Sequence, residues 1–130
     1  MKILTVEDNE INARLIDHIL KELKFEYVHE IAEDAKTALE LTALKQYDII
    51  LMDINLGDGL MDGTGVMMEL RKLSVYQSTP IYAVTCYSLP GDKERFLNSG
   101  FNRYFSKPVN HLELLRAIND DLSAVPKDTF

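Results

Sequence analysis

Apolar residues in this chain fall into five short runs separated by longer stretches with a different pattern. Each run is a few residues long and rich in Ile, Val, Leu or aromatic side chains, which is typical of buried β-strands. The runs lie at residues 3–6, about 25–31, 49–52, 81–84 and 104–105. Because helical stretches follow the runs, the pattern predicts an α/β fold in which five strands alternate with five helices around a parallel sheet.

The stretches between the runs carry apolar residues every three or four positions, as amphipathic helices do. These stripes consist of Ile11, Leu15, Ile19 and Leu23, then Ala35, Leu39 and Ala43, then Val66, Leu70 and Leu73, and finally Leu112, Leu115 and Ile118. A further helix is expected to end just before Gly100, since glycine commonly follows the last helical turn. We therefore expect one helix after every strand.

Parallel strands are covered by helices on both faces, which explains why the run at 49–52 is apolar without interruption. In such sheets ligands bind beyond the carboxyl ends of the strands, near the point where the strand order reverses. Polar residues stand at several of these ends, namely Glu7, Asp8, Asp53, Thr85, Ser106 and Lys107. We expect them to lie together at one edge of the sheet.

Length and composition narrow the class of protein. A chain of 130 residues fits one domain, which we expect to span residues 1–122, followed by a flexible tail over 123–130. The net charge of −7 argues against direct binding of nucleic acid, and no apolar run is long enough for membrane insertion. A single cysteine, Cys86, excludes an internal disulfide and suits the cytoplasm.

Three acids and a lysine at one sheet edge predict a particular chemistry. Two carboxylates ~4 Å apart repel by ~4 kcal/mol at an effective dielectric near 20, so a cation is expected between them. Oxygen ligands favour a hard ion, Mg²⁺ or, as the alternative, Mn²⁺. Asp53 then suits the role of a nucleophile towards phosphorus, Lys107 would neutralise a phosphoryl group, and the Thr85 hydroxyl could donate a hydrogen bond to it.

Four segments resemble the signature motifs of response-regulator receiver domains, in the family's order. They are Val6-Glu7-Asp8-Asn9, Leu51-Met52-Asp53-Ile54-Asn55, Val84-Thr85-Cys86-Tyr87 and Ser106-Lys107-Pro108. The resemblance extends from about Lys2 to about Leu122, and residues 7–12 further resemble receivers of hybrid histidine kinases and phosphorelays. Each motif is common by itself, whereas the four at successive strand ends form a specific signal.

The resemblance implies a flavodoxin-like doubly wound fold with strand order 2-1-3-4-5. It also implies a response regulator rather than an enzyme, one that assists only its own phosphorylation and dephosphorylation. The phosphoryl donor would be a histidine kinase or histidine phosphotransfer protein, and the downstream partner would be a protein that the sequence does not identify. Whether the chain stands alone or is part of a longer kinase stays open.

The resemblance also assigns roles to single residues. Asp53 would accept the phosphoryl group, and Asp8 and Asp53 would bind Mg²⁺ through their carboxylates. Asn55 would bind the ion through its backbone carbonyl and Glu7 through water. Lys107 and Thr85 would contact the phosphoryl group, and Thr85 with Tyr104 would form the switch that changes a partner-binding surface.

The sequence departs from the family pattern at two places. Glu7 stands where many members have Asp, a replacement that we expect to preserve metal binding. The segment from Leu56 to Gly63 is longer and richer in glycine than usual, with Gly57 in place of the common proline. We expect this loop to alter docking and phosphoryl lifetime, and not the site of attachment.

Three alternatives deserve comparison with the receiver interpretation. A phosphohydrolase of the haloacid-dehalogenase kind would need a second acid where Asn55 stands, and an amide cannot transfer the proton. A flavin-binding electron carrier would need phosphate donors where Glu7 and Asp8 would repel phosphate. A degenerate receiver used only for protein contact is disfavoured by the complete set of site residues.

Overall fold

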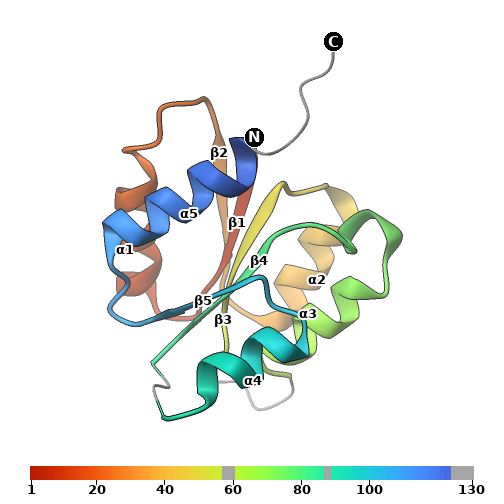
Figure 1. Ribbon diagram of the computed structural model, residues 1–130. Coiled ribbons are helices and arrows are strands. Elements are labelled where there is room, and N and C mark those ends of the chain that lie inside the picture. The colour runs from red at the N-terminus through yellow and green to blue at the C-terminus, as the bar shows by residue number, and fades with distance from the viewer. Residues whose placement is uncertain (57–60, 87–88, 124–130) are drawn as a thin grey trace.

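The computed structural model describes residues 1–56, 61–86 and 89–123, and within them one twisted sheet is flanked by helices on both faces (Figure 1). The strands are β1 (Lys2–Val6), β2 (Val28–Ala32), β3 (Ile49–Asp53), β4 (Ile81–Thr85) and β5 (Arg103–Ser106). These strands pair in parallel, in the order β2-β1-β3-β4-β5. This order confirms the predicted fold class, although β2 begins three residues later than the apolar run suggested.

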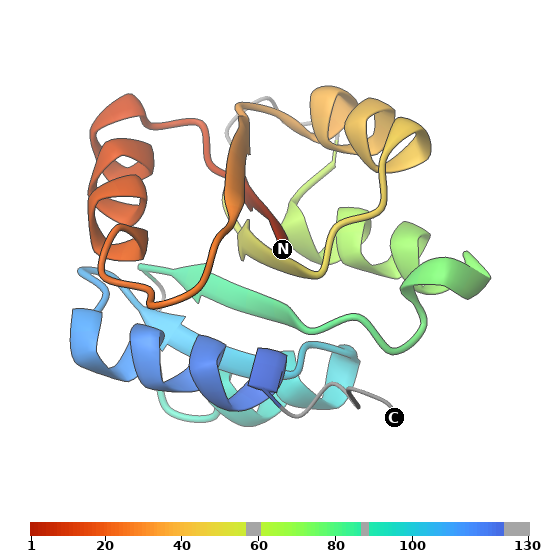
Figure 2. The same ribbon diagram turned by 90° about the horizontal axis from the view of Figure 1, so that it is seen from above.

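One helix follows each strand, with a short 3₁₀ turn before β4. The helices are α1 (Glu10–Leu20), α2 (Ala35–Leu44), α3 (Gly63–Arg71), α4 (Asp92–Ser99) and α5 (His111–Ser123), and the 3₁₀ turn η1 covers Ser74–Tyr76. Viewed from above, α1 and α5 lie on one face of the sheet, while α2 and α3 lie on the other (Figure 2). Phe96 places α4 on the side of α2 and α3, because its ring belongs to their buried cluster.

The described residues form two separate hydrophobic cores, one on each face of the sheet. Successive residues of a strand point to opposite faces, so Ile49 and Leu51 join the core under α1 and α5, while Ile50 and Met52 join the other. All five residues of β3 are buried. The uninterrupted apolar run in this strand is therefore explained by burial on both sides.

The apolar stripes located the helices, but only some residues of each stripe are buried. In α1 the expected stripe included Ile11 and Leu15, and these side chains are 77% and 42% exposed. The buried face of α1 consists of Ala13, Ile16, Ile19 and Leu20, and of these the expected stripe contained Ile19. Ala43, Leu73 and Leu112 are likewise exposed. Periodicity identifies a helix from the spacing alone, whereas its orientation depends on which neighbours it packs against.

Two of the predictions concern segments that the structure does not describe. The predicted loop includes residues 57–60, and most of the predicted tail is residues 124–130; both segments lie outside the described residues. The flexibility of both therefore stays a prediction. Within the described residues, no helix combines the length and apolarity needed to cross a membrane.

Candidate functional site

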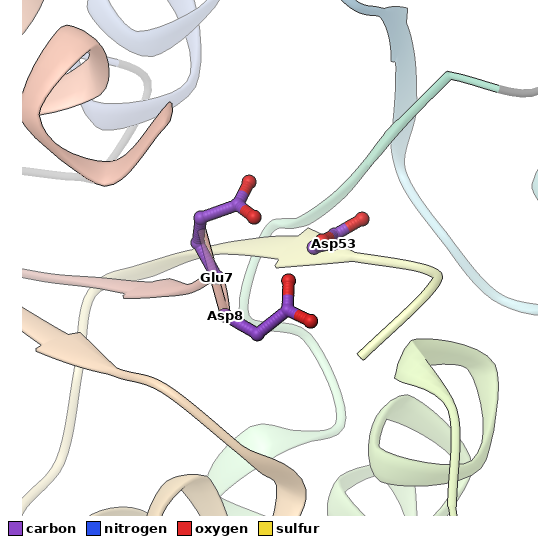
Figure 3. Close-up of side chains that lie close together, drawn as sticks. All are labelled: Glu7, Asp8 and Asp53. Atoms are coloured by element: carbon purple, nitrogen blue, oxygen red, sulfur yellow. The ribbon is translucent and has the colours of Figure 1, made fainter. Parts of the chain in front are cut away.

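Three acidic side chains meet at the carboxyl end of the sheet. Glu7 and Asp8 directly follow β1, and Asp53 is the last residue of the adjacent β3. Each of the three carboxylates places one oxygen within 4.8 Å of such an oxygen of the other two, and Figure 3 shows the three side chains close together. Asp53 and Glu7 are each only 4% exposed, whereas Asp8 is open to solvent. The cluster thus has two buried acids and one accessible acid.

Lys107 places its ammonium group against the two buried acids. Its Nζ lies 2.7 Å from Oε1 of Glu7 and 3.3 Å from Oδ2 of Asp53. The Lys107 backbone N–H donates to the Thr85 carbonyl over 2.8 Å, so the segment after β5 is tied to the end of β4. The sheet therefore brings together residues that are a hundred positions apart in the chain. In this arrangement Glu7 is a closer partner of the ammonium than Asp53 is.

Backbone amides hold the two buried carboxylates in place. The Asn9 N–H donates to Oε2 of Glu7 over 3.1 Å, and the Asn55 N–H donates to Oδ1 of Asp53 over 3.2 Å. Asn9 is also the N-cap of α1, because its side chain accepts the Asn12 N–H at 2.9 Å. The turn after β1 is thereby fixed between the acid cluster and the start of a helix.

The electrostatic balance at this end of the sheet is unfavourable for Asp53. Burial, followed by the negative charge of Glu7, raises the pKa of Asp53 to about 7, although Lys107 opposes this shift. Burial lowers the pKa of Lys107, but its hydrogen bond to Glu7 and the charges of Asp53 and Glu7 outweigh burial and raise it overall. One ammonium does not balance three neighbouring carboxylates. An additional cation would relieve the repulsion.

The donor set fits a hard divalent cation. Three carboxylates can each offer an oxygen within a small radius, and within the described residues no histidine or cysteine joins this cluster. Oxygen-only ligation suits Mg²⁺ and, with similar donors, Mn²⁺. Asn55 lies two residues beyond Asp53 and is exposed.

The two predicted switch residues occupy different positions in the site. Thr85 is the last residue of β4 and is 1% exposed, next to the strand that carries Asp53. Tyr104 lies within β5, where its half-buried ring stacks on Phe96 of α4 with a centroid distance of 5.9 Å. Burial and the negative charge of Asp92 raise the pKa of the Tyr104 hydroxyl. Tyr104 therefore connects the sheet to α4, while Thr85 ends the strand that pairs with the strand of Asp53.

Two residues that contribute to this geometry were assigned no role from the sequence. Asn9 supplies the amide that holds Glu7, and an asparagine directly before a helix is a recognisable N-cap signal. Gly63 begins α3 and packs against the backbone of Asp53, a proximity without a sequence signal because it depends on how α3 returns to the sheet. Glu7, Asp8, Asp53, Thr85 and Lys107 stand at or directly after the carboxyl ends of their strands, as the apolar runs indicated.

Comparisons of the sequence with protein families and with single known proteins identify the same family. Residues 3–119 match the response regulator receiver domain family. The chain is 35% identical to hybrid signal transduction histidine kinase I of Dictyostelium discoideum over 93% of its length, but spans only 7% of that kinase. It is 30% identical to the polar-differentiation response regulator DivK of Brucella anthropi, covering 92% of this chain and 94% of that protein.

A solved structure with a similar fold carries a metal ion. It is the receiver domain of a sensor histidine kinase from Pseudomonas aeruginosa PAO1, with a magnesium ion coordinated in its active site cleft. The two chains are 33% identical with a TM-score of 0.82, and the match covers 95% of this chain and 98% of the other.

Proposed function

The chain belongs to the response regulator receiver domains of two-component signal transduction, and from this premise we propose that Asp53 is its phosphoacceptor. The observation that carries the proposal is the position of the Asp53 carboxylate. It ends a central strand, is 4% exposed, and lies 3.3 Å from the Lys107 ammonium. Two further acids share the same small space. A strand-end acid with a structural role would not need such a costly environment.

In the proposed reaction, a carboxylate oxygen of Asp53 attacks the phosphorus of a partner's phosphohistidine. A P–O bond forms while the P–N bond breaks, and the imidazole leaves with the electron pair and takes up a proton. Lys107 would neutralise charge on the transferring group from its position beside Oδ2 of Asp53. Thr85, at the end of the neighbouring strand, would donate its hydroxyl to a phosphoryl oxygen.

A divalent cation is part of the proposal, with Mg²⁺ the expected ion and Mn²⁺ a substitute. Asp8 and Asp53 would bind it through carboxylates, Asn55 through its backbone carbonyl, and Glu7 through water. When bound, the ion would neutralise the phosphoryl oxygens and the clustered acids. The raised pKa of Asp53 supports this assignment, because a nearby positive charge keeps a buried carboxyl ionised at neutral pH.

The readout of phosphorylation is proposed to pass through Thr85 and Tyr104. The Tyr104 ring stacks on Phe96, so movement of the ring would displace α4 as well as β5. Such a coupled movement would bias a partner-binding surface between two states. We expect the reader of this surface to be a protein, with no direct contact to nucleic acid because of the charge of −7.

The donor is proposed to be a histidine kinase or a histidine phosphotransfer protein in the cytoplasm. Similarity to hybrid kinases and to a separate response regulator supports this donor class. The folded receiver domain is proposed to span residues 1–122. Beyond assisting its own phosphorylation and dephosphorylation, the domain is expected to have no enzymatic activity.

Acetyl phosphate with Mg²⁺ provides a direct test of the acceptor, followed by intact-mass spectrometry. We expect the wild type to gain one base-labile phosphoryl group and Asp53→Asn to gain none. Asp121→Asn is a matched control, because it removes another partly buried carboxylate on α5 that is remote from the cluster in the chain. It should gain the group normally. An unmodified wild type, or an equal gain in Asp53→Asn, would refute the proposal.

A further inference from the structure

Gly63 begins α3 directly beside the strand end that carries Asp53. Its backbone N–H donates to the Ile54 carbonyl over 2.8 Å, and Gly63 itself is buried. The glycines with a positive φ in the described chain are Gly91 and Gly100, so Gly63 is not required for a left-handed turn. Glycine is needed at this position because a side chain would have no room.

A side chain at Gly63 would collide with the backbone. A Cβ atom built there would lie 2.9 Å from the carbonyl carbon of Asp53 and 2.9 Å from Cα of Ile54, and nearer still to the Asp53 carbonyl oxygen. None of these atoms can rotate away as a side chain does. Gly65, two residues later in α3, differs in this respect, because its Cβ would meet Cγ of the flexible Met61 side chain at 2.6 Å.

Ile54 is held from two sides by this contact. Its N–H donates to the Val84 carbonyl of β4 over 3.3 Å, and its carbonyl accepts the Gly63 N–H of α3. Its side chain is 3% exposed. Ile54 separates Asp53 from Asn55, the two residues that would present a carboxylate and a carbonyl to the same ion. The orientation of the Ile54 backbone therefore sets the relative placement of both oxygens.

The helix cannot easily withdraw to admit a side chain. Val66, Met67 and Leu70 of α3 are completely buried in the core between the sheet and the helices. Moving α3 outward would open space around all three, and packed interiors resist such voids. Part of the displacement would then fall on the turn at Ile54.

We propose that Gly63 is a positioning residue for the metal-binding turn, acting through Ile54 on Asp53 and Asn55. This inference rests on the proposed function of the site. A methyl group at position 63 would displace the turn and weaken cation binding without removing any ligand. Residues that orient metal ligands typically contribute roughly 10- to 100-fold to affinity.

The test compares Gly63→Ala with Gly65→Ala by titrating each full chain with Mg²⁺ and following intrinsic tyrosine fluorescence or calorimetric heat. Val66→Ala serves as a second control, because it loosens the same helix without touching the turn. All titrations are run at a temperature where thermal melts show every variant fully folded. We expect Mg²⁺ affinity to fall at least about tenfold in Gly63→Ala and to change less than about threefold in both controls.

The outcomes separate the two proposals. If the wild type binds no Mg²⁺, the proposed function fails and this inference fails with it. If the wild type binds Mg²⁺ and Gly63→Ala binds it equally well, the positioning role is wrong while the proposed function stands. An equal loss of affinity in Val66→Ala would also overturn the role, because general loosening of α3 would then suffice.

Hydrogen exchange in the wild type covers the case in which Gly63→Ala does not fold. Saturating Mg²⁺ should slow exchange of the Gly63 amide several-fold, since that amide is bonded to the turn that the ion would order. The Gly65 amide, bonded to the Asp62 side chain at 2.9 Å, should change much less. Equal protection of the two amides would contradict the positioning role.

Discussion

Two carboxyl groups in this molecule, those of Asp53 and Asp121, have similar neighbours, but their pKa values are shifted in opposite directions. Both are largely shielded from solvent and both contact a basic side chain. Hydrogen bonding from Arg103 lowers the pKa of Asp121, in spite of the opposing effect of burial. Burial and the nearby Glu7 raise the pKa of Asp53, in spite of Lys107.

The difference lies in how many charges share one partner. Arg103 donates from Nε and Nη2 to the two oxygens of Asp121, each over 2.9 Å, and the Tyr82 hydroxyl donates to the same carboxylate. This bidentate pairing is electrically balanced and joins α5 to β5. Lys107, by contrast, is divided between two acids and lies closer to Glu7. A balanced pair stabilises the fold, whereas an unbalanced cluster retains the capacity to bind a cation or a phosphoryl group.

Replacing the basic residue beside each carboxylate should give the largest difference, which is in the rate of phosphorylation. Lys107→Met is expected to slow phosphorylation by acetyl phosphate by about 10²- to 10³-fold, the usual cost of losing a group that stabilises developing negative charge. Arg103→Met should phosphorylate within a few-fold of the wild type and lose stability instead. Single-turnover phosphorylation followed by mass spectrometry provides the comparison. Similar rates for the two variants would contradict the division of roles.

Mg²⁺ should stabilise the protein through the cluster around Asp53, and Asp121 should make no difference to this effect. At a hundredfold excess over the dissociation constant, a ligand specific for the folded state adds about 2.7 kcal/mol to the free energy of unfolding. We expect thermal melts of the wild type and of Asp121→Asn to show this gain. Asp8→Ala should lose it. Equal Mg²⁺ responses in Asp8→Ala and the wild type would rule out Asp8 as a direct ligand.

Neutralising each carboxylate should change stability in opposite directions. In chelator at pH 7, Asp53→Asn should raise the free energy of unfolding by about 1 to 3 kcal/mol, because it relieves repulsion in a buried cluster. Asp121→Asn should lower it by about 1 to 2 kcal/mol through loss of the bidentate pair. Urea denaturation measures both. A shift of the same sign in the two variants would remove the basis of the comparison.

The pH dependence of stability should reveal the same contrast on a smaller scale. A carboxyl with a raised pKa retains a proton in the folded protein that the unfolded chain has already lost. Its contribution to stability therefore falls as pH rises from about 4 to about 7. The advantage of Asp53→Asn over the wild type should grow by about 1 kcal/mol between pH 6 and 8 in metal-free buffer.

Asp121 is expected to behave in the opposite sense. Its pKa is lowered, so its contribution is present above the unfolded value and is lost as pH falls below about 4. The destabilisation caused by Asp121→Asn should consequently shrink in acid and stay constant between pH 6 and 8. Urea titrations of both variants at several pH values provide the measurement. A pH-independent difference between Asp53→Asn and the wild type would contradict the raised pKa.

Much of the site could be anticipated from the sequence because parallel strands share a direction. Once the apolar runs are identified, the residues that follow them must gather at one sheet edge, which is how Glu7, Asp8, Asp53 and Lys107 come together. The apolar periodicity also identified the helices. It misplaced the buried side of α1, because Ile11 and Ile16 are equally apolar and differ only in what lies opposite them.

By itself, the sequence determined the α/β architecture, the strand order through family resemblance, and the acidic character of the sheet edge. Only the tertiary structure decided that the Lys107 ammonium lies closer to Glu7 than to Asp53, that Asp53 is buried enough to shift its pKa, and that Gly63 touches its backbone. The physical reason is the distance along the chain over which each feature is determined. Local patterning and strand direction follow from neighbouring residues, whereas distances between side chains depend on how separate elements pack.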